Sequence, residues 1–224
     1  MFAKAYSQCY ELFNSDKPYK KEIEFIYEWA GRPRDIVDLG CGRADYWKFY
    51  PKDVVITGID RSKDMIAASD YKDNIVCGDI MIATYKLPFD LVTALFDVIN
   101  YLPRHDWWAS LPLEKGGYFI FDCWDKEKVD KDGFKRTIKN VNGLTRTITP
   151  LDRYKKPMKG ERLIPTDYIN LEIKVEGVEV NFKEIHTMFL YSYRDIKRFC
   201  GNDFEIVEIK KTENWQKWFK LIKK

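Results

Sequence analysis

The fold of this chain is decided by residues 35–43, which read DIVDLGCGR. They begin with a short apolar run around Asp38, as expected of a buried parallel strand. Gly40 and Gly42 then turn the chain, and apolar side chains at 47–50 predict a helix after the turn. Glycine has no Cβ, so such a turn lets the main chain approach a bound cofactor, although glycine turns also arise for purely geometric reasons. The stretch therefore predicts a ligand site at the end of a buried strand, which the rest of the chain must support.

The composition is that of an ordinary globular protein. The chain has 224 residues, of which 45% are hydrophobic and 33% charged, which suits one α/β domain or one domain with an insertion. A net charge of +3 is too mild for an extended nucleic-acid surface. No segment is apolar enough to span a membrane, and the 5 cysteines have no metal-binding spacing, so we expect a cytoplasmic protein. The sequence leaves monomer and homodimer open.

Apolar runs and helical patterns alternate along most of the chain, after helices expected within residues 1–30. Expected strands cover 35–39, 54–59, 74–77, 89–95 and 118–123, with a helix opened by Pro103 before the last of them. Strands at 204–209 and 218–222 follow a helix at 193–200, and the final strand should run antiparallel. These patterns predict an α/β fold with a doubly wound, mostly parallel seven-stranded sheet of the Rossmann-like type.

The pattern changes between residues 125 and 190. Asn142-Gly143 lies between two β-like segments and is a strong hairpin signal, and a second hairpin is expected around Glu176-Gly177. We therefore expect an antiparallel β insertion after strand five. The chain then divides into residues 1–124, 125–190 and 191–224. A basic cluster at Lys155, Lys156, Lys159 and Arg162 in the insertion is either solvated surface or a contact for an anionic small-molecule substrate.

Three acidic residues each close an expected strand of the same sheet. They are Asp38, Asp60 and Asp79. Ligands of open parallel sheets bind beyond the carboxyl ends of the strands, and Asp60 follows Gly42 at about the 20-residue spacing of an acid that binds a ribose diol. A single such Asp is often only a turn former, but three behind a glycine turn favour a shared binding site.

Four motifs together resemble one family. They are residues 37–42, 58–62, 78–79 and 96–102, which read VDLGCG, GIDRS, GD and FDVINYL. In order and spacing they are similar to class I S-adenosylmethionine-dependent methyltransferases. Ala44 departs from the pattern, because the family usually has a third glycine there. The 96–102 motif, the aromatic N-terminal helices and the insertion also resemble small-molecule N-methyltransferases, including those that act on amino sugars and glycine.

The resemblance implies S-adenosylmethionine as cofactor and a role for each matching residue. Asp38, Gly40, Gly42 and Phe96 would surround the methionine part, Asp60 the ribose, and Arg61, Met65, Asp79 and Ile80 the adenine, while Tyr10 and Tyr19 would cover the cofactor from the N-terminal helices. The last two could equally be helix-packing residues.

Methyl transfer to an amine requires positioning and the removal of a proton, and it needs no metal. His186, near the end of the insertion, and Tyr10 are the candidate bases. His186 could instead be a structural histidine, and His105 more plausibly caps a helix. We therefore expect transfer of a methyl group from S-adenosylmethionine to a small-molecule acceptor, with an amine nitrogen as nucleophile and in-line displacement as mechanism.

Other functions stay open at this point. One alternative is an RNA or protein methyltransferase, against which stand the mild charge and the lack of an Asn/Asp-Pro-Pro-aromatic motif. Another is a non-catalytic S-adenosylmethionine-binding regulator that uses Trp215, Trp218 and Phe219 as an interface. A dehydrogenase is disfavoured because Asp45 stands where a dinucleotide motif requires glycine, and carboxylates near the turn suit a cation rather than a pyrophosphate.

Overall fold

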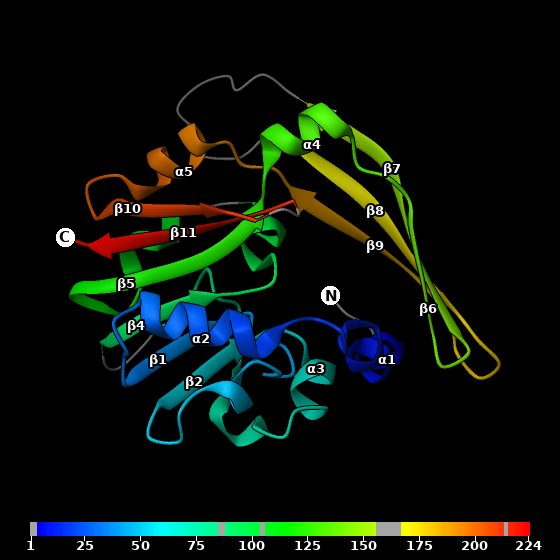
Figure 1. The fold of residues 1–224 in the computed structure, drawn as a ribbon, viewed down its shortest axis with the longest axis horizontal. Helices are drawn as coiled ribbons and strands as arrows, with labels where there is room; N and C mark the ends of the chain where they lie inside the picture. Colours follow the sequence, from blue (N-terminus) through cyan, green and yellow to red (C-terminus); the bar gives the residue numbers. More distant parts are fainter. Residues whose placement is uncertain (1–3, 85–87, 104–105, 156–166, 213–214) are drawn as a thin grey trace.

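The computed structural model describes residues 4–84, 88–103, 106–155, 167–212 and 215–224. These residues form two β-sheets with helices packed around them (Figure 1). The larger sheet has the strand order β10-β11-β5-β4-β1-β2-β3, and the smaller has the order β6-β7-β8-β9. The predicted seven-stranded α/β sheet and the antiparallel insertion after its fifth strand are confirmed.

The larger sheet is parallel except at one edge. Its parallel strands are β1 (Asp35–Leu39), β2 (Val55–Asp60), β3 (Ile75–Cys77), β4 (Phe89–Ala94) and β5 (Leu113–Trp124). β11 (Gln216–Lys223) runs antiparallel to both β5 and β10 (Phe204–Lys211), as expected for the last strand. The strand order reverses beside β1, which pairs with β2 on one side and β4 on the other. Open sheets of this kind bind ligands at such a switch point.

Helices cover both faces of the larger sheet. Ile36 of β1 packs in one cluster with Ile23 of α2 (Tyr19–Trp29), while Val37 and its neighbours pack with Ile196 of α5 (Tyr193–Cys200) on the opposite face. Trp218 is 4% exposed and belongs to the same core. Fully burying one such apolar side chain contributes about 1.5–3 kcal/mol, so the two clusters hold the layers together. Trp218 and the equally buried Phe219 are therefore core residues rather than an exposed interface.

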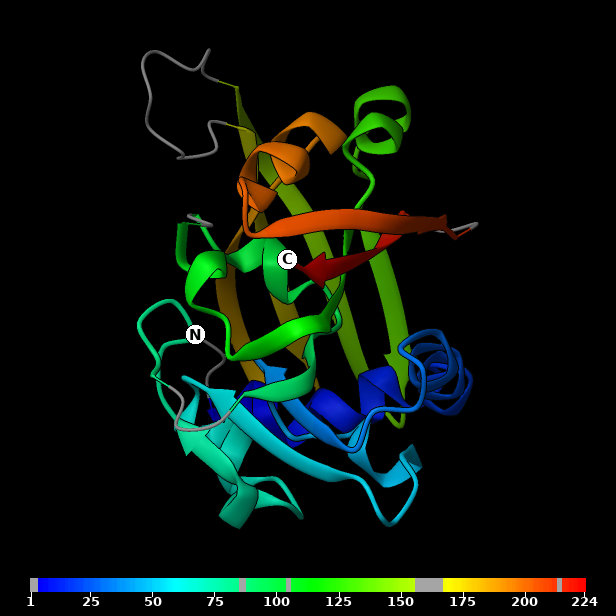
Figure 2. The same ribbon diagram turned by 90° about the vertical axis from the view of Figure 1, so that its left-hand side faces the viewer.

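The smaller sheet stands against the end of the larger one (Figures 1 and 2). It consists of β6 (Thr137–Val141), β7 (Leu144–Lys155), β8 (Asp167–Glu176) and β9 (Asn181–Phe189). Alternate residues of β8 are buried, from Ile169 to Val175, so one face of this sheet is apolar. The predicted hairpin at Asn142-Gly143 is confirmed, with both residues at positive φ, 48° and 77°.

Helix α1 (Lys4–Asn14) and helix α4 (Lys126–Asp132) pack at different places on this apolar face. Tyr6 and Phe13 of α1 share a buried cluster with Ile173 and Val175 of β8. Val129 of α4 packs with other residues of β8 and β9 near the end of β5. The Tyr10 ring of α1 also lies 6.2 Å from the Phe96 ring in the loop after β4, so α1 bridges the smaller sheet and a loop of the larger one. No helix among the described residues is long and apolar enough to cross a lipid bilayer.

Two expected helices are shorter than predicted. After the glycine turn there is only a 3₁₀ helix, η1 (Trp47–Phe49), because Pro51 lacks the N–H that a longer helix would require. The segment expected to form a helix from Pro103 contains η4 (Asp106–Ser110), also 3₁₀, and residues 104–105 lie outside the described part. The remaining short helices are α3 (Lys63–Ala67), η2 (Lys72–Asn74) and η3 (Val98–Tyr101).

Two strand boundaries also differ from the prediction. β5 begins at Leu113 and runs through Gly116-Gly117, because Gly116 has a φ of 87° and lies at an irregularity of the β4–β5 pairing rather than at a turn before the strand. The predicted hairpin at Glu176-Gly177 has a longer turn than a two-residue hairpin, because β9 begins only at Asn181 and Val178 is fully exposed within the turn.

Candidate active site

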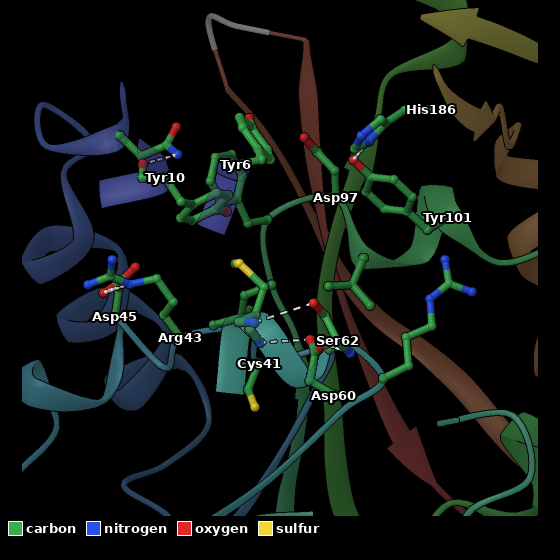
Figure 3. Close-up of a pocket in the computed structure, with 18 of the residues that line it drawn as sticks. Tyr6, Tyr10, Cys41, Arg43, Asp45, Asp60, Ser62, Asp97, Tyr101 and His186 are labelled. Carbon is green, nitrogen blue, oxygen red and sulfur yellow. Dashed lines mark hydrogen bonds and ion pairs between the residues drawn. The ribbon is translucent and has the colours of Figure 1, made fainter. Parts of the chain in front are cut away.

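One cavity of about 280 Å³ lies between the carboxyl ends of β1–β4, the apolar face of the smaller sheet and helix α1 (Figure 3). This volume is close to the lower end of the range for small-molecule sites. The structure brings all the residues predicted as site residues to its wall: Tyr10, Tyr19, Asp38, Gly40, Gly42, Asp60, Arg61, Met65, Asp79, Ile80, Phe96 and His186. Their placement agrees with a shared site, and their individual roles stay predictions.

The glycine turn forms the floor of the cavity. Gly40 has a φ of 64°, and a Cβ there would stand 2.7 Å from Val98 Cγ1. Gly42 has a φ of 55°, and a Cβ there would stand 3.1 Å from the Met65 methyl carbon. Ala44, where a third glycine was expected, also has a positive φ of 60°. A left-handed conformation costs a residue with a Cβ roughly 1–2 kcal/mol, so Ala44 carries backbone strain.

Asp60 holds this turn in place. Its Oδ2 accepts a hydrogen bond of 2.8 Å from the Gly42 N–H, and its Oδ1 accepts one of 2.7 Å from the Ser62 N–H (Figure 3). Ser62 in turn caps α3, because its side chain accepts a hydrogen bond from the Met65 N–H. Burial raises the pKa of Asp60, against the two backbone donors that lower it. Each carboxylate oxygen has a second lone pair, so the same group is also able to accept hydrogen bonds from a ligand diol.

Asp38 lies deeper, with both carboxylate oxygens in hydrogen bonds. Trp47 Nε1 donates to Oδ2 at 2.8 Å, and Thr93 Oγ1 donates to Oδ1 at 2.7 Å. Burial raises the pKa of Asp38 to about 6, despite these two donors. Since burial disfavours a lone negative charge, this position favours a nearby cationic group.

One wall of the cavity follows the end of β3. Asp79 Oδ1 accepts a hydrogen bond of 2.9 Å from the Met81 N–H, so the acid also shapes its own turn. Ile80 and Met65 are buried beside it, whereas Arg61 is exposed at the rim. These residues leave the Asp79 carboxylate beside an apolar wall, an arrangement that suits a flat heterocycle with an exocyclic amine.

The loop after β4 is strained in the part that faces the cavity. Phe96 and Asp97 both have left-handed backbone, with φ of 66° and 63°. Their N–H groups donate to Asp122 Oδ1 and Oδ2 at 2.6 and 3.1 Å, and Gln216 donates to the same carboxylate at 3.0 Å. Two left-handed residues cost roughly 1–2 kcal/mol each, and this buried carboxylate is what holds them. Burial and the Asp97 carboxylate raise the pKa of Asp122 well above its usual range.

Asp97 presents an unsatisfied acceptor at the cavity wall. Its Oδ1 is buried and accepts no hydrogen bond from any residue that the structure describes. Burial raises the pKa of this carboxyl. A buried polar atom without a partner is costly, roughly 1–3 kcal/mol, so it indicates a missing ligand group. A cation or an N–H donor at this point would satisfy it, which fits an ammonium or sulfonium group.

His186 lies on the opposite wall, in a chain of three side chains. Its Nε2 is 2.9 Å from Glu184 Oε2. Its Nδ1 is 2.9 Å from the Tyr101 hydroxyl (Figure 3). A carboxylate accepts only, so Nε2 carries the hydrogen of the neutral imidazole and Nδ1 accepts from Tyr101. Burial raises the pKa of Tyr101 well above its usual value, which keeps the phenol protonated. His186 is 4% exposed, so this chain is shielded from solvent.

Aromatic rings from α1 complete the enclosure. The Tyr10 ring packs edge-on against Tyr6 and Phe96, with centroid distances of 5.8 and 6.2 Å. The Tyr6 ring in turn lies 6.3 Å from the His186 ring. Tyr19 packs with Tyr46 at 4.8 Å and still lines the cavity. Burial raises the pKa of Tyr10 well above its usual value, so it is a neutral hydrogen-bonding phenol.

Of the remaining sequence candidates, the structure describes only Lys155. Lys155 pairs with the Asp130 carboxylate at 3.1 Å, while Lys156, Lys159, Arg162 and His105 lie outside the described residues. Within the described ranges, no three His, Cys, Asp or Glu side chains lie close enough together to hold a metal ion.

Comparisons with known proteins support the fold. No model of a protein family and no curated protein sequence matches the chain. Among solved structures, an S-adenosylmethionine-dependent methyltransferase from Clostridium acetobutylicum is similar at a TM-score of 0.75 and 19% identity, covering 96% of each chain. CalS10, an amino pentose methyltransferase from Micromonospora echinaspora solved with S-adenosylmethionine bound, is similar at 0.73 and 14% identity, covering 100% of this chain and 98% of the other.

A third solved structure extends the same likeness. The sugar N-methyltransferase KedS8 from a Streptoalloteichus species has a TM-score of 0.70 and 16% identity, covering 96% of this chain and 92% of the other. The fold is therefore that of the S-adenosylmethionine-dependent methyltransferases, as the four sequence motifs predicted. The likeness extends over the smaller sheet, because the matched regions cover nearly the whole chain.

Sequence reasoning missed several residues of this site. Asp97 follows a strand as the three predicted acids do, so the same signal would have found it. Glu184 and His186 alternate along one strand, which predicts that they share a face. For Tyr101 and Arg146 no local signal exists, because their place at the cavity depends on how the two sheets and α1 meet. The same holds for Asp122, which is buried behind the loop after β4 and accepts hydrogen bonds from it.

Proposed function

We propose that this protein transfers a methyl group from S-adenosylmethionine to the amine nitrogen of a small-molecule acceptor. The observation that carries the proposal is the two-part cavity: an acid-rich half at the strand ends and an enclosed half against the smaller sheet. The orphaned Asp97 oxygen and the glycine floor, where a Cβ would collide with Val98, fit a cationic cofactor lying along this edge. The similarity to sugar N-methyltransferases supports the same reaction class.

The residues of the first half would bind and orient the cofactor. Asp60 would accept the ribose hydroxyls while keeping Gly42 in place, and Asp38 would lie near the ammonium. Arg61, Met65, Asp79 and Ile80 would surround the adenine. When bound, S-adenosylmethionine supplies an electrophilic methyl group on a positively charged sulfur. Phe96, Tyr10 and Tyr19 would then exclude water and stabilise this charge by about 0.5–2 kcal/mol.

The residues of the second half would accept the proton that the acceptor nitrogen loses. The Tyr101 oxygen would take it while the Tyr101 hydroxyl proton passes to His186 Nδ1, and Glu184 would stabilise the resulting imidazolium. The Tyr101 hydroxyl lies 2.9 Å from His186 Nδ1, and His186 Nε2 lies 2.9 Å from Glu184 Oε2, and these short distances support the proposed proton path. Tyr10 is the second candidate, and its raised pKa favours a donor or positioning role over that of a base.

We also propose that the chain works as three parts. Residues 1–124 would bind the cofactor, 125–190 would form the acceptor side, and 191–224 would complete the larger sheet. The enclosure of the cavity by the smaller sheet and α1 supports a small acceptor over RNA or a folded protein.

Two measurements test the proposed function. Isothermal calorimetry should show binding of S-adenosylmethionine and of its demethylated product, and incubation with a panel of amines should release that product stoichiometrically with methylated amine. Cofactor binding without turnover on small amines, amino sugars, RNA or protein would favour a regulatory role. Absence of cofactor binding would refute the proposal.

A further inference from the structure

The acceptor half of the cavity contains an arginine whose guanidinium has no directly paired acidic partner among the described residues, although its charge contributes to lowering the pKa of Asp16. Arg146 of β7 lines the cavity. Among the described residues, none forms an ion pair with it. Two other arginines line the cavity: Arg43 pairs with Glu11 and Asp45 at 2.7 and 3.6 Å, and Arg61 is exposed at the rim of the cofactor half. Arg146 is therefore the positive group on the acceptor side.

Aromatic groups hold the Arg146 side chain in place. Its guanidinium carbon lies 5.0 Å from the centroid of the Phe13 ring, and Nη1 lies 3.4 Å from the Tyr6 hydroxyl oxygen. Both aromatic side chains are buried, at 0% and 4% exposure, so they restrict the guanidinium without cancelling its charge. A guanidinium has five N–H donors, and these contacts use few of them. The arrangement suits bidentate recognition of a carboxylate or phosphate.

Strand register places Arg146 on the same face as the proton-accepting chain. Arg146 of β7 pairs with Val175 of β8, and Val175 pairs with Phe182 of β9. His186 of β9 pairs with Leu171, which lies four residues before Val175 on β8 and therefore on the same face. Successive same-face residues are about 7 Å apart along a strand, but the two side chains converge on Tyr6. The Tyr6 hydroxyl contacts Arg146, and the Tyr6 ring lies 6.3 Å from the His186 ring.

We infer that the methyl acceptor is an amine that carries a carboxylate or phosphate, and that Arg146 binds this anionic group. This inference rests on the proposed function. The Tyr6 side chain lies between Arg146 and His186, so the distance between these two groups is about the size of one aromatic side chain. The anionic group and the reacting nitrogen of the acceptor are therefore separated by a short chain of bonds. Apolar side chains surround both polar points and would contact that chain: Ile148, Leu171, Ile173 and Met188.

Matched acceptor pairs test the inference. Rates with S-adenosylmethionine are measured for β-alanine against propylamine and for phosphoethanolamine against ethanolamine, which separates carboxylate from phosphate recognition. We expect the wild-type protein to prefer an anionic member by about tenfold or more in kcat/KM, the effect of a hydrogen-bonded charge. Arg146→Met should abolish the preference by raising KM for that member, and Arg146→Lys should keep part of it. Arg136→Gln, which removes the same charge from an exposed position, should keep it fully.

A binding measurement separates failure of this inference from failure of the proposed function. Inorganic phosphate should bind the wild-type protein saturably by calorimetry, and Arg146→Met should lose this binding while its cofactor affinity and melting temperature stay unchanged. Equal rates for both members of each pair would overturn the inference and leave methyl transfer standing. If no amine is methylated, the proposed function fails. Phosphate binding that is lost in Arg146→Met would then still support the anion site, and absence of such binding would refute it.

Discussion

The two sheets build their halves of the cavity by different means. The larger sheet uses main chain at strand ends: Gly40 and Gly42 leave room, and carboxylates such as Asp60 tie the turns together through backbone N–H groups. The smaller sheet uses side chains from one pleated face, with Glu184, His186 and Arg146 among apolar neighbours. A site made of backbone suits a ligand that is the same throughout a fold family. A site made of side chains on a sheet face changes with single substitutions, which suits a variable acceptor.

The largest expected effect is on turnover. It tests whether residues of the smaller sheet act in methyl transfer rather than in cofactor binding. His186→Asn should lower kcat by about 10²–10⁴-fold, the usual contribution of general acid–base catalysis, while cofactor affinity stays unchanged. Tyr101→Phe should have a similar effect because it removes the hydroxyl between nitrogen and imidazole. Single-turnover kinetics and calorimetry measure the two quantities. Thr187→Val, on the opposite face of β9, is the control. A His186 variant with normal kcat would eliminate the proton-transfer chain.

The corresponding test of the larger sheet measures how much Asp60 contributes to cofactor affinity. Asp60→Ala should weaken S-adenosylmethionine binding by more than about tenfold, because hydrogen bonds to a charged group contribute about 1.5–3 kcal/mol and the Gly42 turn loses its anchor. Calorimetry gives the affinity, and Asp73→Ala at an exposed site is the control. Unchanged affinity would rule out the ribose assignment.

Protonation of Asp38 should weaken cofactor binding, which is a further test of the role of the larger sheet. Burial raises the pKa of this carboxyl to about 6 in the ligand-free protein. A cationic ligand favours the ionised form, so affinity should be full above pH about 6 and fall as the pH drops below it, approaching tenfold per unit. Calorimetry across this range should also detect proton release on binding. Asp38→Asn should bind weakly with a flatter pH profile, and an identical profile would show that other groups, such as Asp97, cause the dependence.

The smallest expected effect is on stability and concerns the glycine turn alone. Ala44→Gly should stabilise the protein by less than about 1 kcal/mol, because relief of left-handed strain is partly offset by the entropic cost of glycine and by the loss of a buried methyl group. Thermal unfolding should show a rise of less than about 4 °C for a chain of this size. Ala109→Gly, at an exposed position in η4, should be destabilising instead. A loss of stability in Ala44→Gly would show that the turn is not strained.

The strand boundaries of the larger sheet could be predicted accurately from the sequence, because its buried strands are apolar runs followed by acidic residues and glycines. β1 was predicted to the residue, and β2 to β4 within one residue at either end. The predictions failed where pairing overrides local preference. The strand expected at 118–123 begins at Leu113 instead and contains Gly116. The helix expected after Gly42 is a short 3₁₀ turn, whose Trp47 side chain donates to Asp38.

By itself the sequence determined the sheet class, the glycine turn and the acids at the strand ends, since these depend on residue type and on spacing along one segment. Only the tertiary structure decided that α1 covers the site, that Tyr101 meets His186 and that Arg146 faces the same cavity. The Tyr101–His186 contact joins residues 85 positions apart, and the Arg146–Tyr6 contact joins residues 140 positions apart. Strand register and helix docking set both. No local pattern records which face of a strand another element will cover.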